Sequence, residues 1–192
     1  MDAASIAGQR CAEPLWRPAR RLRRSGIPKK YLPWLLDQSS LTERIITACP
    51  GCFRVRVVSQ TRARVLRSEA EALNMRPGTH AIVRQVQLLC DEVPWVYART
   101  IIPPATLNRR LRRLVRLGSR SLGATLFSDP SMERGEAEVT CLTAANELFH
   151  TVANGSSSKP EKIWGRRSVF QLGGKPLLVC EFFLPEIGEF TE

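Results

Sequence analysis

Two charged residues interrupt the otherwise apolar faces of predicted β-strands. Side chains of a strand alternate between its two faces. In the segment 81–90, Arg84 shares its face with apolar residues only: Ile82, Val86, Leu88 and Cys90. In the segment 176–184, Glu181 is the only charged residue, and it shares its face with Leu177, Val179 and Phe183. We therefore expect both charged side chains to point into the protein interior.

A buried ion is costly unless it is paired and hydrogen-bonded, so each of these two residues needs a reason. One interpretation is structural: Arg84 and Glu181 form a buried ion pair, or shifts in strand register expose them. The other is functional: they line an enclosed pocket, where Arg84 binds a carboxylate with two parallel hydrogen bonds and Glu181 is the opposing polar group. Arg99 and Arg166 show the same pattern more weakly. More than one inward arginine would suit a ligand with two negative charges.

The surrounding patterns predict an antiparallel sheet. Alternating or apolar segments predict strands at 53–59, 61–67, 81–90, 95–102, 136–142, 164–172 and 175–184. Short connections after 81–90 and at Gly173-Gly174 predict two hairpins. A capping box at Ser40–Glu43 predicts a helix, and further helices are expected at 106–117 and 121–127. Because no strand–helix–strand rhythm is present, we expect an α+β fold, with one face of the sheet covered.

The composition favours one domain preceded by a basic segment. The chain has 192 residues and a net charge of +11, and residues 1–30 contain eight Lys and Arg against two acidic residues. We expect a flexible leader over 1–30 and a folded domain over 31–192. The leader and the five arginines of 106–117 lack any recognition motif, so we expect solvated side chains and no nucleic-acid partner. The absence of a membrane-length apolar run or a signal-peptide pattern favours the cytosol.

Other residues that could do chemistry are few. Six cysteines in a chain of this length, without a secretion signal, do not require disulfides, and we expect Cys90 and Cys180 to be small buried side chains. The Cys49-x-x-Cys52 motif lacks a second zinc-ligand pair and the setting of a redox motif, so we interpret it as structural. No glycine-rich nucleotide loop and no nucleophile motif is present. Nothing therefore indicates a metal, a nucleotide or a covalent intermediate.

The C-terminal segment resembles that of the chorismate pyruvate-lyase family. Its matching blocks are Trp164-Gly165-Arg166-Arg167-Ser168, Gly174-Lys175-Pro176-Leu177-Leu178 and Glu181-Phe182-Phe183-Leu184-Pro185. Upstream, Ser40-Leu41-Thr42 is similar to the family's D-S-M-T segment, and Arg84 lies in what looks like its L-R-E strand. Pro94-Trp95 through Arg99-Thr100 to Pro103 resembles its P-W-L-x-x-R-T-x-x-P strand, and Leu122-Gly123 with Leu126-Phe127 looks like its P-L-G-x-x-L-F helix. Several blocks in the same order are more specific than any one block.

This resemblance implies a single antiparallel sheet of about six strands, with short helices enclosing a buried ligand pocket. It also implies a monomeric lyase, without metal or other cofactor, that converts chorismate to 4-hydroxybenzoate and pyruvate and supplies a ubiquinone precursor. Carried over residue by residue, Arg84 would hold the ring carboxylate, assisted by backbone groups of Leu41 and Leu122. Glu181 would face the ring hydroxyl, either as a proton acceptor or as an orienting group. Arg84 and Glu181 are therefore the expected catalytic residues.

The chain departs from the family pattern at three places. Leu41 stands where Met is frequent, and Ser121 stands where Pro often precedes Leu122. The segment 144–162 is longer than in the shortest members, and we interpret it as a lid or loop insertion that affects product release. Two other functions stay open. One is a ligand-sensing domain like those of GntR-type regulators, although only about 30 residues precede the match. The other is a lyase for a related cyclohexadiene acid.

Overall fold

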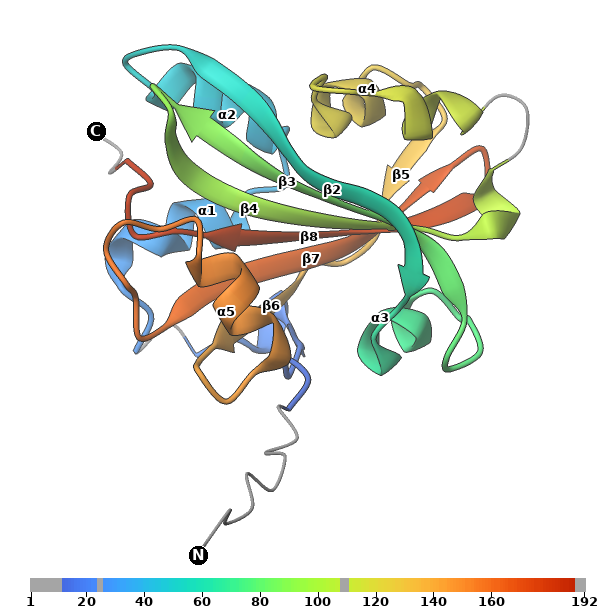
Figure 1. The fold of residues 1–192 in the computed structure, drawn as a ribbon, viewed down its shortest axis with the longest axis horizontal. Helices are drawn as coiled ribbons and strands as arrows, with labels where there is room; N and C mark the ends of the chain where they lie inside the picture. The colour runs from blue at the N-terminus through green and yellow to red at the C-terminus, as the bar shows by residue number, and fades with distance from the viewer. Residues whose placement is uncertain (1–11, 24–25, 108–110, 189–192) are drawn as a thin grey trace, which may run out of the picture.

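The computed structural model describes residues 12–23, 26–107 and 111–188, and an antiparallel sheet dominates it (Figure 1). Within these residues the sheet has eight strands in the order β1-β6-β7-β8-β4-β3-β2, with β5 paired to β7. The strands are β1 Arg17–Pro18, β2 Phe53–Arg64, β3 His80–Cys90, β4 Val93–Ile102, β5 Met132–Arg134, β6 Glu138–Leu142, β7 Ile163–Leu172 and β8 Lys175–Phe183. The predicted α+β fold is confirmed. The number of strands exceeds six because β1 and β5 are too short to produce an alternation pattern.

Short helices cover both faces of this sheet. They are α1 Leu32–Leu36, α2 Leu41–Ala48, α3 Arg67–Ala72, α4 Leu122–Phe127 and α5 Glu147–Ala153. In Figure 1, α2 and α4 lie above the strands, and α3 and α5 lie below them. The expectation of a single covered face is wrong because alternate residues of the central strands are apolar on both sides. Val86 and Ala98 share one buried cluster with α1 and α2, whereas Val83 and Tyr97 share another with α3 and α5.

The two predicted hairpins are confirmed, but the first strand differs from its prediction. Strands β3 and β4 turn at Asp91 and Glu92, and β7 and β8 turn at Gly173-Gly174, where both glycines have positive φ. We expected two strands at 53–59 and 61–67, but β2 is one continuous strand that pairs with β3 over its whole length. A bulge between Val57 and Ser59 shifts the alternation, and this shift mimics the end of a strand.

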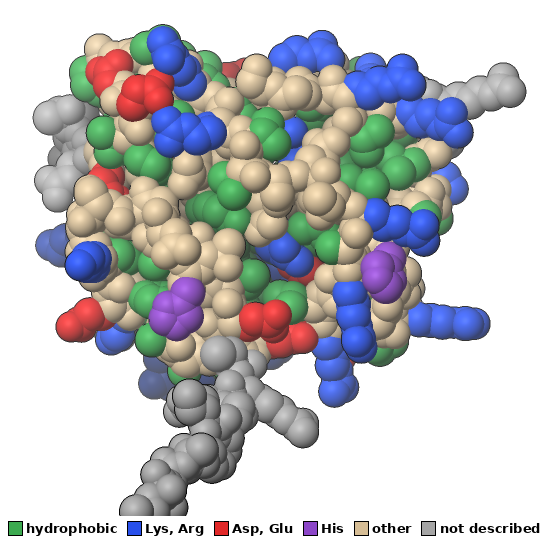
Figure 2. Space-filling view, in the orientation of Figure 1, with side chains coloured by type: hydrophobic (Ala, Val, Ile, Leu, Met, Phe, Trp, Pro, Cys, Tyr) green, Lys and Arg blue, Asp and Glu red, His purple; other side chains and the backbone are tan. Residues whose placement is uncertain are grey.

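The helix predicted at 106–117 is also different. Its described residues form 3₁₀ turns at Pro104–Thr106 and Leu111–Arg116, and residues 108–110 lie outside the described part of the chain. Leu111 and Leu114 are buried three residues apart, a spacing that a 3₁₀ turn aligns on one face. Figure 2 shows Lys and Arg side chains spread around the rim of one face of the molecule. Among the described residues, no helix is long and apolar enough to cross a membrane.

Part of the predicted leader packs on the domain. Backbone pairing joins β1 to β6, and Trp16 stacks near Phe182, with 6.0 Å between the ring centroids. The Glu13 carboxylate accepts hydrogen bonds from the backbone N–H groups of Arg67 and Ser68 at the start of α3. We expected a flexible leader over 1–30; residues 12–23 instead contribute an edge strand and a helix cap, and residues 1–11 lie outside the described part.

A disulfide joins the end of α2 to the end of β3. Cys49 and Cys90 are bonded, with their Cα atoms 5.7 Å apart, whereas Cys52 is free and exposed. We expected that no disulfide is required and that Cys90 is a small buried side chain; Cys90 is buried, but it is bonded to Cys49, so the structure corrects the first expectation. The partners are 41 residues apart in sequence, and no local pattern signals such a pairing.

Opening this disulfide is expected to destabilise the fold. A loop of this length corresponds to about 2–4 kcal/mol of unfolding free energy. Urea unfolding of the Cys49→Ser/Cys90→Ser variant, or of the wild type with a thiol reductant, should show that loss. The Cys52→Ser variant is the matched control and should unfold at the wild-type midpoint. Identical midpoints with and without reductant would contradict the pairing.

Candidate active site

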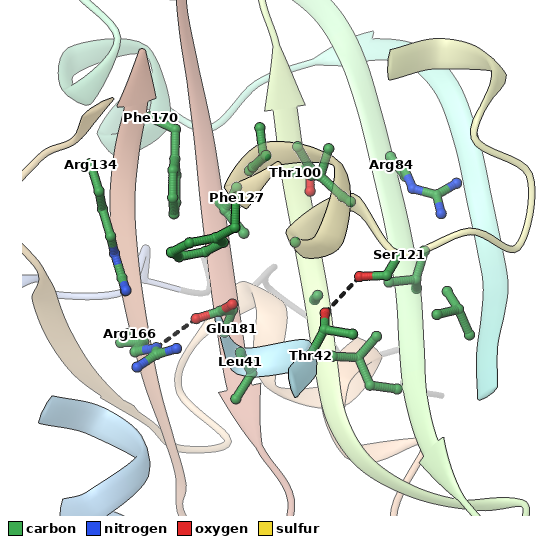
Figure 3. A pocket seen from close by; sticks show the side chains of 18 of the residues that line it. Leu41, Thr42, Arg84, Thr100, Ser121, Phe127, Arg134, Arg166, Phe170 and Glu181 are labelled. Atoms are coloured by element: carbon green, nitrogen blue, oxygen red, sulfur yellow. Dashed lines mark hydrogen bonds and ion pairs between the residues drawn. The ribbon is translucent and has the colours of Figure 1, made fainter. Parts of the chain in front are cut away.

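A pocket lies between the sheet and helices α2 and α4 (Figure 3). Its floor contains the small side chains of Ala98 and Thr100 on β4, flanked by residues of β3 and β8. Its walls are mostly apolar: Leu41, Val55, Val86, Leu88, Leu122, Leu126, Phe127, Phe170 and Val179. Arg84 and Glu181, the two charged residues that strand alternation predicts to face inward, both line it.

Arg84 is held at one side of the pocket by uncharged oxygens. Its guanidinium donates to the Gln60 side chain at 3.1 Å, to the Gly118 carbonyl at 2.9 Å and to the Arg120 carbonyl at 3.3 Å. The side chain is 2% exposed, and burial lowers its pKa. No carboxylate of the described residues forms an ion pair with it. Arg84 is therefore a buried cation poised beside an open pocket, as a carboxylate receptor requires.

Glu181 pairs with Arg166 rather than with Arg84. The two residues are register partners on β8 and β7, and Arg166 Nε donates to Glu181 Oε2 at 2.5 Å. Arg166 also donates to the carbonyls of Trp34 and Asp37. The structural alternative of an Arg84–Glu181 ion pair is therefore wrong: β4 separates their strands, so their backbones are roughly 10 Å apart. The Glu181 side chain is 15% exposed and that of Arg166 is 1% exposed, so the carboxylate still reaches the pocket.

Two further arginines, Arg99 and Arg134, differ in whether they reach the pocket. Arg99, predicted to face inward with Arg84, lies on the opposite face and donates twice to Glu69 of α3, at 2.7 and 3.0 Å. It takes no part in the pocket because its neighbour Thr100 occupies the position in register with Arg84. Arg134 on β5 does line the pocket, and sequence reasoning missed it. A three-residue strand carries no alternation that would have singled it out.

The N-terminal ends of α2 and α4 meet at the pocket. Leu41 and Leu122 are their first residues, capped by Ser40 and Ser121, and both line the pocket. The hydroxyls of Thr42 and Ser121 lie 2.6 Å apart and tie the two helix starts together. The first backbone N–H groups of a helix have no partner within it and favour an anion. The predicted roles of Leu41 and Leu122 are thus compatible with their position.

Gly123 permits the close approach of these two helices. A Cβ atom at this position would lie 2.8 Å from Thr42 Oγ1. We expect Gly123→Ala to push α4 away from α2 at a cost of about 1–2 kcal/mol, and hence to weaken pocket ligands roughly tenfold. Calorimetric titration with 4-hydroxybenzoate, the product that the family resemblance implies, measures this effect. The Gly123→Ala/Thr42→Ala variant, which lacks the clashing hydroxyl, should recover part of the affinity. Full wild-type affinity in Gly123→Ala would show that ligand binding does not depend on the close approach of α2 and α4.

The segment 144–162, which we interpreted from the sequence as a lid or loop insertion, lies away from the pocket. It contains α5, whose residues Leu148, Phe149 and Val152 pack in the cluster on the second face of the sheet. None of its residues lines the pocket; the segments over the pocket come from α2 and α4. Within the described part of the chain, no cluster of three or more His, Cys, Asp or Glu side chains could hold a metal ion.

The fold and the pocket together define an α+β ligand-binding domain with an arginine-lined interior site. The chain belongs to the chorismate lyase family, whose model matches residues 11–190. It is 40% identical over 163 residues to a probable chorismate pyruvate-lyase of Azoarcus sp. (strain BH72), covering 83% of this chain and 86% of that protein. It is 37% identical over 176 residues to a probable chorismate pyruvate-lyase of Nitrosospira multiformis, covering 92% and 96%.

Two solved structures of low sequence identity show the same fold. PhnF from Mycobacterium smegmatis has a TM-score of 0.56 at 15% identity, covering 81% of this chain and 68% of PhnF. The ligand-binding domain of a putative GntR-family regulator from Bordetella bronchiseptica has a TM-score of 0.51 at 17% identity, covering 74% of this chain and 90% of that domain. At these identities the likeness concerns the fold alone.

Proposed function

We propose that this protein is a chorismate pyruvate-lyase, which converts chorismate to 4-hydroxybenzoate and pyruvate. The observation that supports this most directly is the convergence of Arg84 and Glu181 from separate strands on one apolar pocket, in a member of the chorismate lyase family. The pocket combines cations for carboxylates, a carboxylate for a hydroxyl, and aromatic walls for a ring. Chorismate carries all three of these groups.

Each site residue has a distinct role in this proposal. Arg84 binds the ring carboxylate, with help from the backbone N–H groups of Leu41 and Leu122 at the two helix starts. Glu181 contacts the ring hydroxyl, and its ion pair with Arg166 fixes its orientation. The ring lies over Ala98 and Thr100. The substrate is thereby held by its two ends, and the reacting bond lies between them.

The reaction requires the substrate to be held in the correct orientation, and it consumes no oxidant or reductant. The ether bond between the ring and the enolpyruvyl oxygen breaks, and the neighbouring ring carbon, which bears the hydroxyl, loses its hydrogen. The ring becomes aromatic, and the enolpyruvyl methylene gains a proton to give pyruvate. Atoms and electrons balance without an external oxidant or reductant. Glu181 serves either as the acceptor of the ring proton or as the group that orients the hydroxyl, and Arg166 and Arg84 stabilise the developing negative charge.

We propose that the protein works as a monomer in the cytosol without metal or other cofactor, and that its product supplies a ubiquinone precursor. The test is to incubate the purified protein with chorismate and a metal chelator and to follow both products. We expect equimolar 4-hydroxybenzoate and pyruvate. Tight binding of chorismate or 4-hydroxybenzoate without turnover would overturn the lyase proposal and favour a sensor. Turnover of only a related cyclohexadiene acid would reassign the substrate.

A further inference from the structure

Two arginines converge at the end of the pocket beyond Glu181. Arg134 of β5 and Arg166 of β7 both donate to the carbonyl oxygen of Asp37, and Arg134 Nε also donates to Ser168 Oγ at 3.2 Å. The Arg134 guanidinium lies 5.4 Å from the centre of the Phe170 ring, another wall of the pocket. In Figure 3, Arg134 and Arg166 stand on the side of Glu181 away from Arg84.

The charges that line the pocket are not balanced. Of the described residues that line the pocket, Arg84, Arg134, Arg166 and Glu181 are charged, which leaves a net charge of +2. Glu181 is already bound to Arg166. The Asp37 carboxylate is engaged by Arg44 and Ser39. Arg134 therefore has only neutral hydrogen-bond acceptors among the described residues.

Partial burial makes this excess charge costly. Desolvation lowers the pKa of Arg134, and the neighbouring Arg166 cation lowers it further, although the Glu181 and Asp37 carboxylates oppose both effects. A guanidinium stays protonated in proteins. An anion beside it, rather than the loss of a proton, would therefore offset the desolvation cost of this charge. A ligand with two carboxylates would neutralise the net charge of the pocket.

The geometry separates the two positive ends. Arg84 is on β3 and Arg166 is on β7, with β4 and β8 between them. Three strand spacings put their backbones roughly 14 Å apart, so one carboxylate cannot reach both ends of the pocket. An anion bound by Arg134 and Arg166 would therefore be a different group from the carboxylate on Arg84, placed beyond the hydroxyl that Glu181 faces.

We propose that Arg134, together with Arg166, binds the enolpyruvyl carboxylate of the substrate, and that Arg134 makes the pocket selective for a dianion over the monoanionic aromatic product. This inference rests on the proposed lyase function. After the ether bond breaks, the second carboxylate leaves with pyruvate, and 4-hydroxybenzoate no longer contacts Arg134. Arg134 thus favours substrate over product in the same pocket.

The test compares two ligands across two variants. For Arg134→Gln we expect kcat/KM for chorismate to fall about 100-fold, while the dissociation constant of 4-hydroxybenzoate changes less than about threefold. Arg134→Lys keeps the charge and should recover at least part of the kcat/KM. Arg84→Gln is the comparison, and it should weaken both ligands. Thermal unfolding of each variant checks that it is folded.

An equal loss for substrate and product in Arg134→Gln would overturn the inference, as would wild-type kcat/KM. The wild type in the same experiment reports separately on the proposed function. If the wild type binds chorismate without turnover, the lyase proposal fails. The effect of Arg134→Gln is then measured as two dissociation constants, for chorismate and for 4-hydroxybenzoate, so the inference is still decided.

Discussion

Replacing Arg84 by methionine is expected to lower kcat/KM for chorismate by about 100–1000-fold while leaving the fold at least as stable. Truncating one partner of a buried charge pair costs about 3–4 kcal/mol of binding, and here the unpaired partner would be the ring carboxylate. Stability should not fall with activity, because Arg84 is buried without a carboxylate partner among the described residues. Removing this cation also removes the cost of its desolvation, which offsets the loss of its hydrogen bonds to Gln60, Gly118 and Arg120.

Steady-state kinetics, 4-hydroxybenzoate titration and thermal unfolding of Arg84→Met measure both effects. The exposed strand residue Arg62 gives a matched control, since Arg62→Met removes a cation from β2 outside the pocket. That variant should keep wild-type kinetics. A large loss of stability in Arg84→Met, with activity lost only in proportion to unfolded protein, would mean that Arg84 is structural.

Replacing Glu181 by glutamine is expected to act mainly on kcat, with a fall of at least about 100-fold. A general base contributes about 10²–10⁴-fold, and glutamine cannot accept the proton. The substitution raises the net charge of the pocket by one, so KM for a dianion should stay the same or decrease. Arg166 would be left buried without its carboxylate, and we expect a loss of about 3 kcal/mol in unfolding free energy.

The same variant separates the two roles that Glu181 could have. If Glu181 only orients the ring hydroxyl, glutamine still offers an oxygen acceptor and kcat should stay within about tenfold of wild type. Glu138→Gln is the matched control. Glu138 pairs with Arg167 at 2.7 Å outside the pocket, so its loss should alter stability without altering kcat. A rise in KM with unchanged kcat in Glu181→Gln would contradict both roles.

Strand alternation predicted the two central residues because each lies in a long, otherwise apolar strand. It did not identify their partners: the pairing of Glu181 with Arg166 follows from the register of the Gly173-Gly174 hairpin, whereas the separation of both residues from Arg84 depends on the strand order β7-β8-β4-β3. Alternation also left Arg99 and Arg166 equivalent, and the pairing of Arg84 with Thr100 decides that only Arg166 faces the pocket. Which face of a strand points toward the pocket is decided only when the whole sheet is assembled.

Local sequence patterns could not identify residues that act through their backbone groups or that lie in very short strands. Leu41 and Leu122 look like ordinary apolar residues: the local patterns place both near the start of a predicted helix, but only the family resemblance indicated a binding role for them. Arg134 lies in a strand of three residues. The Cys49–Cys90 disulfide depends on α2 ending beside β3, which no spacing in the sequence encodes. The bulge in β2 was mistaken for the boundary between two strands, because both interrupt the alternation of apolar and polar residues.

The most direct test of this account is a crystal structure with 4-hydroxybenzoate bound. We expect the ring over Ala98 and Thr100, the carboxylate on Arg84 beside the Leu41 and Leu122 N–H groups, and the hydroxyl on Glu181. Arg134 should make no contact with this product. The reverse orientation, with the carboxylate on Arg134 and Arg166, or a product molecule bound outside this pocket, would contradict the account.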